Sequence, residues 1–519
     1  MGVRGTRGPA LYPEAMLESL GRRLSAFFRA TAPDPFVLAI LLTFLTFALA
    51  IGFSERSPAE VTEAWAADGG IWRYLGFGMQ MCLILVTGHA IAASRPVSGA
   101  ISFLAHLPRT GPQAAALVAL VAASLGVFHW GVGLIGGALI ARDVGRVMVR
   151  RGVRVHYPVL VAAGYVGMMV WHGGFSGTAP IKVTTARDLA DVIDSDAGLA
   201  PIPLSETLLS PMNLVTTGGL LLLCPIVMAL LMPRSRRNPD DFMESVADDH
   251  IQPMDHFVAV GKLPETDFDP DHVDTSAPRS DDDKAIIPKL LEDTPVINWA
   301  LALLIGLWAF GHYLPGAAGD LGATLSAWVP IGGSVDADGN PVSGLMNLTP
   351  NTLNLTMFML GLLLHASPAS YMRAIEDAAR GCAGIIIQFP LYAGIAAMMA
   401  ASGLTALIAE KLSSGASETT LPVLTFFSAA VVNIFVPSGG GQWGVQGPIV
   451  IESALAAGVE PSKMVMALAY GDQVTNMLQP FWALPLLAIT GVKARDIVGY
   501  TAILMLIAIV WMVGCLLIF

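Results

Sequence analysis

Charged residues are scarce in this sequence. Asp, Glu, Lys and Arg make up 13% of its 519 residues, against about 25% in typical soluble domains. Charge is absent from three long apolar runs, at 36–53, 212–232 and 497–519. Each run approaches the roughly 20 residues that a helix needs to cross about 30 Å of hydrocarbon. The sequence therefore predicts an integral membrane protein and excludes an ordinary soluble domain.

Cysteine is also rare, and metal-ligand motifs are missing. Cys82, Cys224, Cys382 and Cys515 all lie in apolar segments without metal-ligand spacing, so we expect small apolar side chains there. The glycine run 439–441 lacks the Gly-Lys-Ser/Thr ending of a phosphate-binding loop. We expect no metal and no cofactor, apart from a coupling proton or sodium ion.

Positive charge is too sparse for a nucleic-acid-binding protein. The net charge is −11, and residues 234–293 alone hold sixteen acidic and seven basic residues. The rest of the chain is close to neutral. The acidity thus belongs to one polar loop, and it argues against a nucleic acid partner.

The hydropathy pattern predicts an all-α polytopic membrane protein. The predicted fold has two inverted repeats, each with about four transmembrane helices and one re-entrant hairpin, joined by a connecting helix. The predicted organisation is an amphipathic N-terminal segment at 1–33, repeat 1 at 34–232 with a hairpin at 112–150, an acidic and disordered loop at 233–294, a connecting helix with an external loop at 295–352, and repeat 2 at 353–519 with a hairpin at 419–457.

Basic residues set the expected orientation. Five arginines between Arg142 and Arg154 follow the first hairpin, whereas residues 315–352 contain no Lys or Arg. Because basic residues concentrate on the cytoplasmic side, we expect a multi-pass protein of the inner membrane. Its N-terminus and the loop at 233–294 are then cytoplasmic.

Four spacings recur in order along the two halves. Ser57-Pro58-Ala59 returns as Ser367-Pro368-Ala369, and Trp130-Gly131-Val132 returns as Trp443-Gly444-Val445. Gln80 before an Ala-Ala-Ser sequence matches Gln388, and Tyr165 matches Tyr470. Inverted repeats place a binding site near the bilayer midplane, where broken helices meet.

Each half contains a broken hairpin and an interrupted span. Glycine and proline break these helices, and the exposed N–H groups at helix N-termini favour anions. Neutral hydrogen-bonding side chains at the breaks suit a carboxylate. The predicted substrate-binding residues are His129, Trp130, Gly131, His172, Gly173, Gly174, Ser176, Thr178, Asn433, Ser438, Gly439, Gly440, Gly441, Gln442, Asn476 and Gln479.

Asp472 is a carboxylate inside a predicted membrane segment. Such a group is costly and marks a functional site by default, so Asp472 is the candidate for binding the coupling ion or proton. A purely structural carboxyl is the alternative. His129 and His172 either titrate near neutral pH or cap a broken helix.

Several motifs together resemble a known family. Phe77 to Met81, Trp171 to Gly177, Val436 to Gly441 and Gln479 to Pro485 are similar to segments of the bacterial short-chain fatty acid transporters. The resemblance extends from about residue 33 to the C-terminus. It implies ion-coupled uptake of acetoacetate, butyrate and similar monocarboxylates, an elevator-type motion and a homodimer in the lipid bilayer.

Two other functions stay open at this point. A transporter of dicarboxylates or other organic anions would need a second anion-binding group, and the interrupted segments hold no Arg or Lys except Lys182 at their edge. A membrane enzyme could use His129, His172 and Asp472 as a catalytic set, although no nucleophile motif supports it. The predicted reading is a transporter and not an enzyme.

Overall fold

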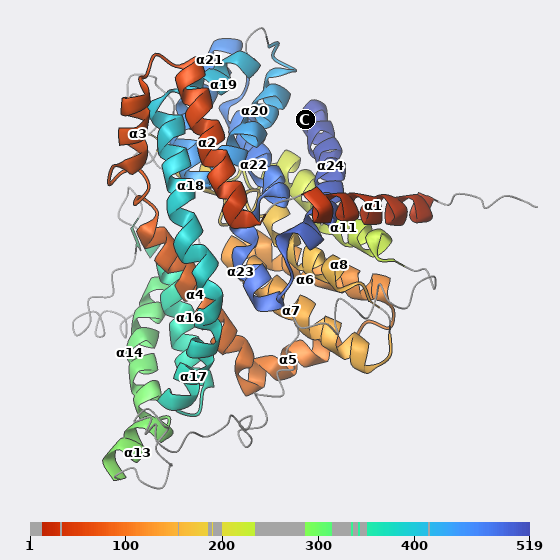
Figure 1. Ribbon diagram of the computed structural model, residues 1–519, viewed down its shortest axis with the longest axis vertical. Coiled ribbons are helices and arrows are strands. Elements are labelled where there is room, and N and C mark those ends of the chain that lie inside the picture. Colours follow the sequence, from red (N-terminus) through yellow and green to blue (C-terminus); the bar gives the residue numbers. More distant parts are fainter. Residues whose placement is uncertain are drawn as a thin grey trace, which may run out of the picture.

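The part of the chain that the structure describes is almost entirely helical (Figure 1). The computed structural model describes residues 13–31, 34–153, 155–184, 189, 200–233, 286–313, 334–335, 341–342, 350–413 and 416–519. Most of the predicted acidic loop and of the external loop lies outside the described residues. Two short strands, β1 (Ser334–Val335) and β2 (Pro341–Val342), pair antiparallel.

Among the described residues, six helical segments are long and apolar enough to span a membrane by length and composition. They are α2 (Pro35–Phe53), α6 (Gly111–Phe128), α11 (Pro211–Leu231), α14 (Val296–Tyr313), the segment Pro368–Ala401 and α24 (Ala494–Ile518). A seventh candidate is the pair of α4 (Leu75–Ala93) and α5 (Arg95–Ala105), which is bent by 72°.

Sequence signals at the helix starts explain many of these boundaries. A side-chain acceptor followed by proline begins α2 at Asp34, α3 (Pro58–Ala66) at Ser57, α11 at Ser210 and α17 (Pro368–Ala379) at Ser367. The acceptor satisfies an otherwise unpaired N–H group, and proline fits the first helical position. Ser57 and Ser367, which match in the predicted repeat, both form a capping box.

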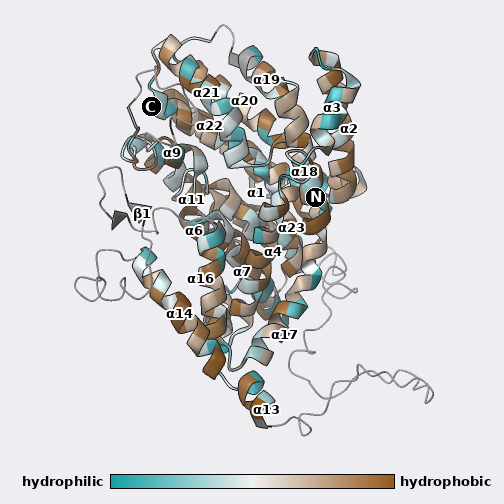
Figure 2. Cartoon of the chain, turned by 90° about the vertical axis from the view of Figure 1, so that its left-hand side faces the viewer, coloured by the Kyte–Doolittle hydropathy of each residue, from teal (hydrophilic) through white to brown (hydrophobic). Residues whose placement is uncertain are grey.

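A peripheral group of helices lies on the left of Figure 1. In it α2 packs along α18 (Ala383–Ala401), and α4 packs against α16 (Pro350–Leu364) and α17. The short helix η6 (Arg380–Cys382) joins α17 to α18, and α13 (Ile286–Asp293) precedes α14. Figure 2 shows hydrophobic residues along α14, and large apolar side chains such as Leu303 and Phe44 are exposed there and on α2. These faces suit contact with lipid.

The other helices pack against this group and one another. Besides α5, α6, α11 and α24, they are α7 (Trp130–Arg150), α8 (Tyr157–Gly164), the 3-10 helix η1 (Tyr165–Met169), α9 (Thr178–Lys182), α19 (Leu404–Ser413), α20 (Leu421–Phe435), α21 (Gly439–Ala457), α22 (Pro461–Thr475), the 3-10 helix η7 (Asn476–Leu478) and α23 (Pro480–Thr490). The N-terminal helix α1 (Pro13–Thr31) packs across α24 (Figure 1), where Gly21 faces the ring of Tyr500. Its placement on the membrane surface stays a prediction.

Both predicted hairpins are pairs of helices broken at the expected points. Helices α6 and α7 turn back at His129, and Gly126 packs against Gly133 across the pair. Helices α20 and α21 are separated by residues 436–438, and Gln442 contacts the Ala429 carbonyl of the opposite helix. Whether either hairpin is re-entrant, and whether the halves are inverted, stays a prediction.

Candidate functional site

The first hairpin tip is fixed by polar contacts. His129 ends α6 and caps α7, because its Nδ1 accepts a hydrogen bond from the N–H of Gly131 at 3.1 Å. The N–H group of Trp130, the first residue of α7, donates to the Ser176 hydroxyl at 3.0 Å. The tip is therefore attached to the interrupted segment that follows η1.

That interrupted segment is rich in glycine because backbones approach closely there. A Cβ on Gly174 would lie 2.3 Å from the Val127 carbonyl oxygen, and one on Gly177 would lie 2.1 Å from that of His172. The N–H groups of His172 and Gly173 donate to Gln473 Oε1 at 3.0 and 3.2 Å. The structure thus gives these glycines a packing role, and contact with substrate stays a prediction for them.

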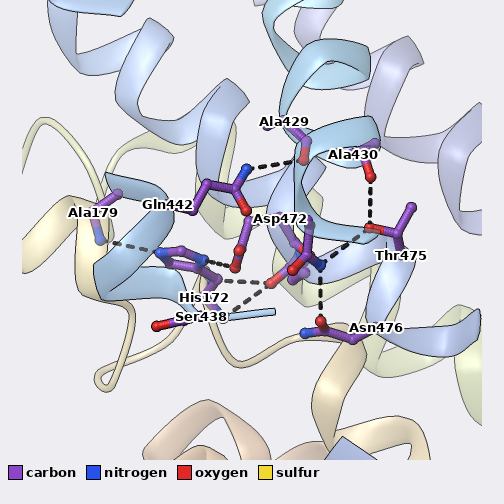
Figure 3. A network of polar contacts seen from close by, with 12 residues as sticks. His172, Ala179, Ala429, Ala430, Ser438, Gln442, Asp472, Thr475 and Asn476 are labelled. Carbon is purple, nitrogen blue, oxygen red and sulfur yellow. Dashed lines mark hydrogen bonds and ion pairs between the residues drawn. The ribbon is translucent and has the colours of Figure 1, made fainter. Parts of the chain in front are cut away.

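His172 and Asp472 form a buried pair that joins the two halves of the chain (Figure 3). Nδ1 of His172 lies 2.5 Å from Oδ2 of Asp472, and the side chains are 0% and 1% exposed. Nε2 of His172 accepts the N–H of Ala179, in the first turn of α9, at 3.0 Å. Since Nε2 is an acceptor, the proton of the neutral ring is on Nδ1 and is donated to the carboxylate.

A polar network continues from Asp472 along α22 (Figure 3). Nδ2 of Asn433 donates to the Asp472 carbonyl and also reaches the Thr475 hydroxyl at 3.1 Å and Asn476 Oδ1 at 2.9 Å. Gln479 donates in turn to the Asn433 carbonyl. Within the described residues, three buried oxygens here have no hydrogen-bond donor: Asp472 Oδ1, Asn433 Oδ1 and Gln479 Oε1.

The second hairpin tip lies against this pair. Ser438 caps α21 by accepting the Gly441 N–H at 3.2 Å. A Cβ on Gly439 would lie 2.7 Å from the Trp171 ring, 3.1 Å from the Thr178 hydroxyl and 3.3 Å from the His172 ring. Only glycine lets the first turn of α21 come this close to the pair.

Aromatic rings connect the two tips. The Trp482 ring centroid lies 5.1 Å from that of Trp130 and 6.4 Å from that of Trp171, and Trp171 stacks on His172 at 4.4 Å. Phe77 packs edge-on to Trp482 at 6.0 Å. The tip of the first hairpin therefore contacts the pair through an apolar aromatic layer.

A cavity of about 170 Å³ lies on the other face of the second tip. It is bounded by the start of α4, by α18 and α19, and by the first residues of α21. Its lining residues are Arg73, Tyr74, Ala396, Ala400, Thr405, Val436, Gly440, Gly441, Gln442 and Gly444.

A larger cavity of about 500 Å³ lies elsewhere, between α7, α17 and the end of α23. It is lined by Arg142, Arg146, Arg380 and Asp377 among others, and by none of the predicted site residues. We place the candidate site at the smaller cavity and the buried pair, because the predicted residues gather there.

The structure brings most predicted residues together, in two layers. Around the His172–Asp472 pair lie Asn433, Asn476, Gln479, Thr178 and Gly439. The smaller cavity is lined by Gly440, Gly441 and Gln442. Trp130 belongs to the aromatic layer, and His129 and Gly131 lie beside it at the first hairpin tip. Gln473, Arg73, Tyr74 and Trp482 were not among the predicted site residues. Gln473 adjoins Asp472 in the sequence, and Trp482 belongs to a motif shared with the family, so the sequence already pointed to both residues.

Comparisons with known proteins agree with this arrangement of motifs. The sequence profile of the short chain fatty acid transporter family matches residues 16–253 and 342–519. A protein of Escherichia coli (strain K12) is 39% identical over 485 residues, covering 93% of this chain and 96% of the relative. One of Haemophilus influenzae (strain Rd) is 35% identical over 490 residues, with the same two coverages. Both relatives are provisionally named short-chain fatty acid transporters.

Among solved structures, the YdaH transporter of Alcanivorax borkumensis is 15% identical, with 94% of this chain and 97% of that chain covered and a TM-score of 0.40. The profile covers most of the chain, and the two relatives are 39% and 35% identical over 93% of it. The chain therefore belongs to the short-chain fatty acid transporter family.

Proposed function

We propose that this protein takes up short-chain monocarboxylates, such as butyrate and acetoacetate, across the inner membrane by ion-coupled symport. The observation that carries the coupling step is the buried His172–Asp472 pair, in which each half of the chain supplies one partner at 2.5 Å. Family membership supports the substrate class, and the positions of the basic residues support a cytoplasmic N-terminus.

The pair suits coupling because its charge can be neutralised. With a neutral imidazole and an ionised Asp472, the pair would carry one negative charge, and both side chains are almost completely buried. A proton or sodium ion at Asp472 Oδ1 removes that charge, which lowers the cost of moving the site through the membrane. The free oxygens of Asn433 and Gln479 belong to the same network and offer further acceptors.

Buried oxygens without a hydrogen-bond donor favour the binding of a cation. A buried polar atom without a partner costs roughly 1–3 kcal/mol, and three such oxygens are present in this network. A bound cation would recover part of that cost. We propose that the two hairpin tips and the interrupted segments move together in an elevator-type step once the ion is bound.

Uptake by purified protein in proteoliposomes tests this function. Labelled butyrate should accumulate when an inward sodium or proton gradient is imposed, and the two gradients are applied separately to identify the ion. Labelled succinate is the comparison for the dicarboxylate alternative, and liposomes without protein give the background. Succinate accumulation without butyrate accumulation would replace the monocarboxylate by a dicarboxylate substrate.

A further inference from the structure

We infer that the cavity beside the second hairpin tip binds the carboxylate of the substrate, with Arg73 as its counter-ion. This inference rests on the proposed function and assigns one part of it, the anion subsite, to residues outside the interrupted segments. Arg73 precedes Tyr74, the N-cap residue of α4, and both residues line the cavity.

The charge of the cavity fits a single carboxylate. Arg73 is the charged residue in a lining that is otherwise made of neutral side chains and backbone. Within the part of the chain that the structure describes, Arg73 forms no salt bridge. A guanidinium group recognises a carboxylate through two parallel hydrogen bonds. One guanidinium and no second cation favour a monoanion over a dianion.

The backbone adds a second anion-attracting element. Gly440 and Gly441 belong to the first turn of α21, where N–H groups and the helix dipole favour negative charge. The position of a Cβ on Gly441 lies 3.3 Å from the Tyr74 hydroxyl oxygen, so that hydroxyl stands over the same turn. Arg73, Tyr74 and the α21 N-terminus thus converge on one cavity.

The size of the cavity also matches a small acid. Its volume of about 170 Å³ is below the roughly 300–1,000 Å³ of pockets that hold drug-sized ligands. Ala396 and Ala400 of α18 supply apolar walls for a short alkyl chain. Longer chains would meet these walls.

The first turn of α21 connects this subsite to the buried pair. Gly441 faces Tyr74 and the cavity, whereas Gly439 faces Trp171 and His172. A carboxylate held at one face of the turn and an ion held behind its other face share a single rigid element. This shared element would make the occupancy of each site sensitive to the other.

The test compares Arg73→Gln, Arg73→Lys and Arg56→Gln for butyrate uptake in proteoliposomes. Arg56 is the matched control. Like Arg73 it is an exposed arginine, but it pairs with Glu60 at 3.3 Å and does not line the cavity. Losing a charge-assisted bond should raise the KM of Arg73→Gln for butyrate about ten- to a hundredfold. Arg73→Lys should lie between wild type and Arg73→Gln, and Arg56→Gln should stay within about twofold of wild type.

A second readout separates charge recognition from structural damage. Unlabelled butyrate and its neutral analogue butyramide compete with labelled butyrate, and the wild type should prefer the acid. In Arg73→Gln this preference should collapse. An unchanged KM and an unchanged preference in Arg73→Gln overturn the inference while leaving the proposed function intact.

If Arg73→Gln does not reach the membrane, the KM for butyrate and the preference for butyrate over butyramide are measured on Arg73→Lys and Tyr74→Phe instead. Wild-type values in both variants would overturn the inference. Failure of wild-type protein to take up butyrate overturns the proposed function and this inference together.

Discussion

Replacing Asp472 by Asn removes the charge of the buried pair with almost no change in shape. The side chain is 1% exposed, and its Oδ2 receives the Nδ1 proton of His172 at 2.5 Å. In the Asn variant the amide oxygen can still accept this proton, so a charge-assisted bond becomes a neutral one. The difference between the two kinds of bond is about 1–2 kcal/mol, which is small enough for the variant to fold.

The expected result follows from the charge that is lost. Without the carboxylate the site cannot bind a coupling cation, so gradient-driven accumulation of butyrate should fall to the level of empty liposomes. Exchange of internal for external butyrate does not require the empty carrier to return. Counterflow should therefore persist within about tenfold of wild type, as a loss of about 1.4 kcal/mol allows.

The assay measures counterflow and driven uptake on the same purified variant. Glu452→Gln is the control, because it neutralises an exposed carboxylate on α21 and should change neither rate. Normal accumulation by Asp472→Asn would refute the coupling role. Poor expression together with normal accumulation by the surviving protein would indicate a structural carboxyl instead.

Two further predictions concern the second hairpin tip. Gly439→Ala should reduce uptake at least tenfold, because its Cβ would lie 2.7 Å from the Trp171 ring, whereas Gly514→Ala on α24 meets nothing within 4 Å and should transport normally; equal rates would contradict the close packing. A Gly440→Cys variant should react with a water-soluble thiol reagent above the background of the four buried native cysteines, and butyrate should protect it. A cysteine at exposed Glu452 should react whether or not butyrate is present, and protection of both positions would point to a general conformational change.

Local sequence signals predicted much of the fold. Apolar runs located the long helices, and residue pairs such as Asp34-Pro35 and Ser367-Pro368 marked their starts, because capping and proline geometry act within one turn. The hairpin breaks at His129 and Ser438 were visible for the same reason. The family was also recognisable, because its motifs are contiguous in sequence.

The partners of the site residues could not be predicted in the same way. His172 and Asp472 are 300 positions apart, so nothing local distinguishes the pair from two separate helix caps. His129, by contrast, acts as a helix cap, because its Nδ1 accepts the Gly131 N–H at the start of α7. Arg73 was missed since it lies before a predicted span, and only the tertiary structure brings Arg73 and Tyr74 to the first turn of α21.

The structure also shows where the matching sequences of the predicted repeat lie in their helices. Trp130 is the first residue of α7, whereas Trp443 is the fifth residue of α21, so the matching Trp-Gly-Val sequences do not occupy equivalent helical positions. The capping residues His129 and Ser438 are the better structural match, because each caps the second helix of its hairpin. The position of a helix break therefore shows which residues of the two hairpins correspond better than identity over three common residues does.

Reciprocal contacts explain why the site needs both halves. Tyr165 of the first half donates to the Asn476 carbonyl of the second at 2.9 Å, and Tyr470 of the second half donates to Asn213 Oδ1 of the first at 3.0 Å. These two tyrosines matched each other in the predicted repeat. Because each interrupted segment is anchored by the other half, neither half can position the His172–Asp472 pair alone. These contacts would transmit a displacement of one segment to the other, as the proposed coupling between an ion and a substrate requires.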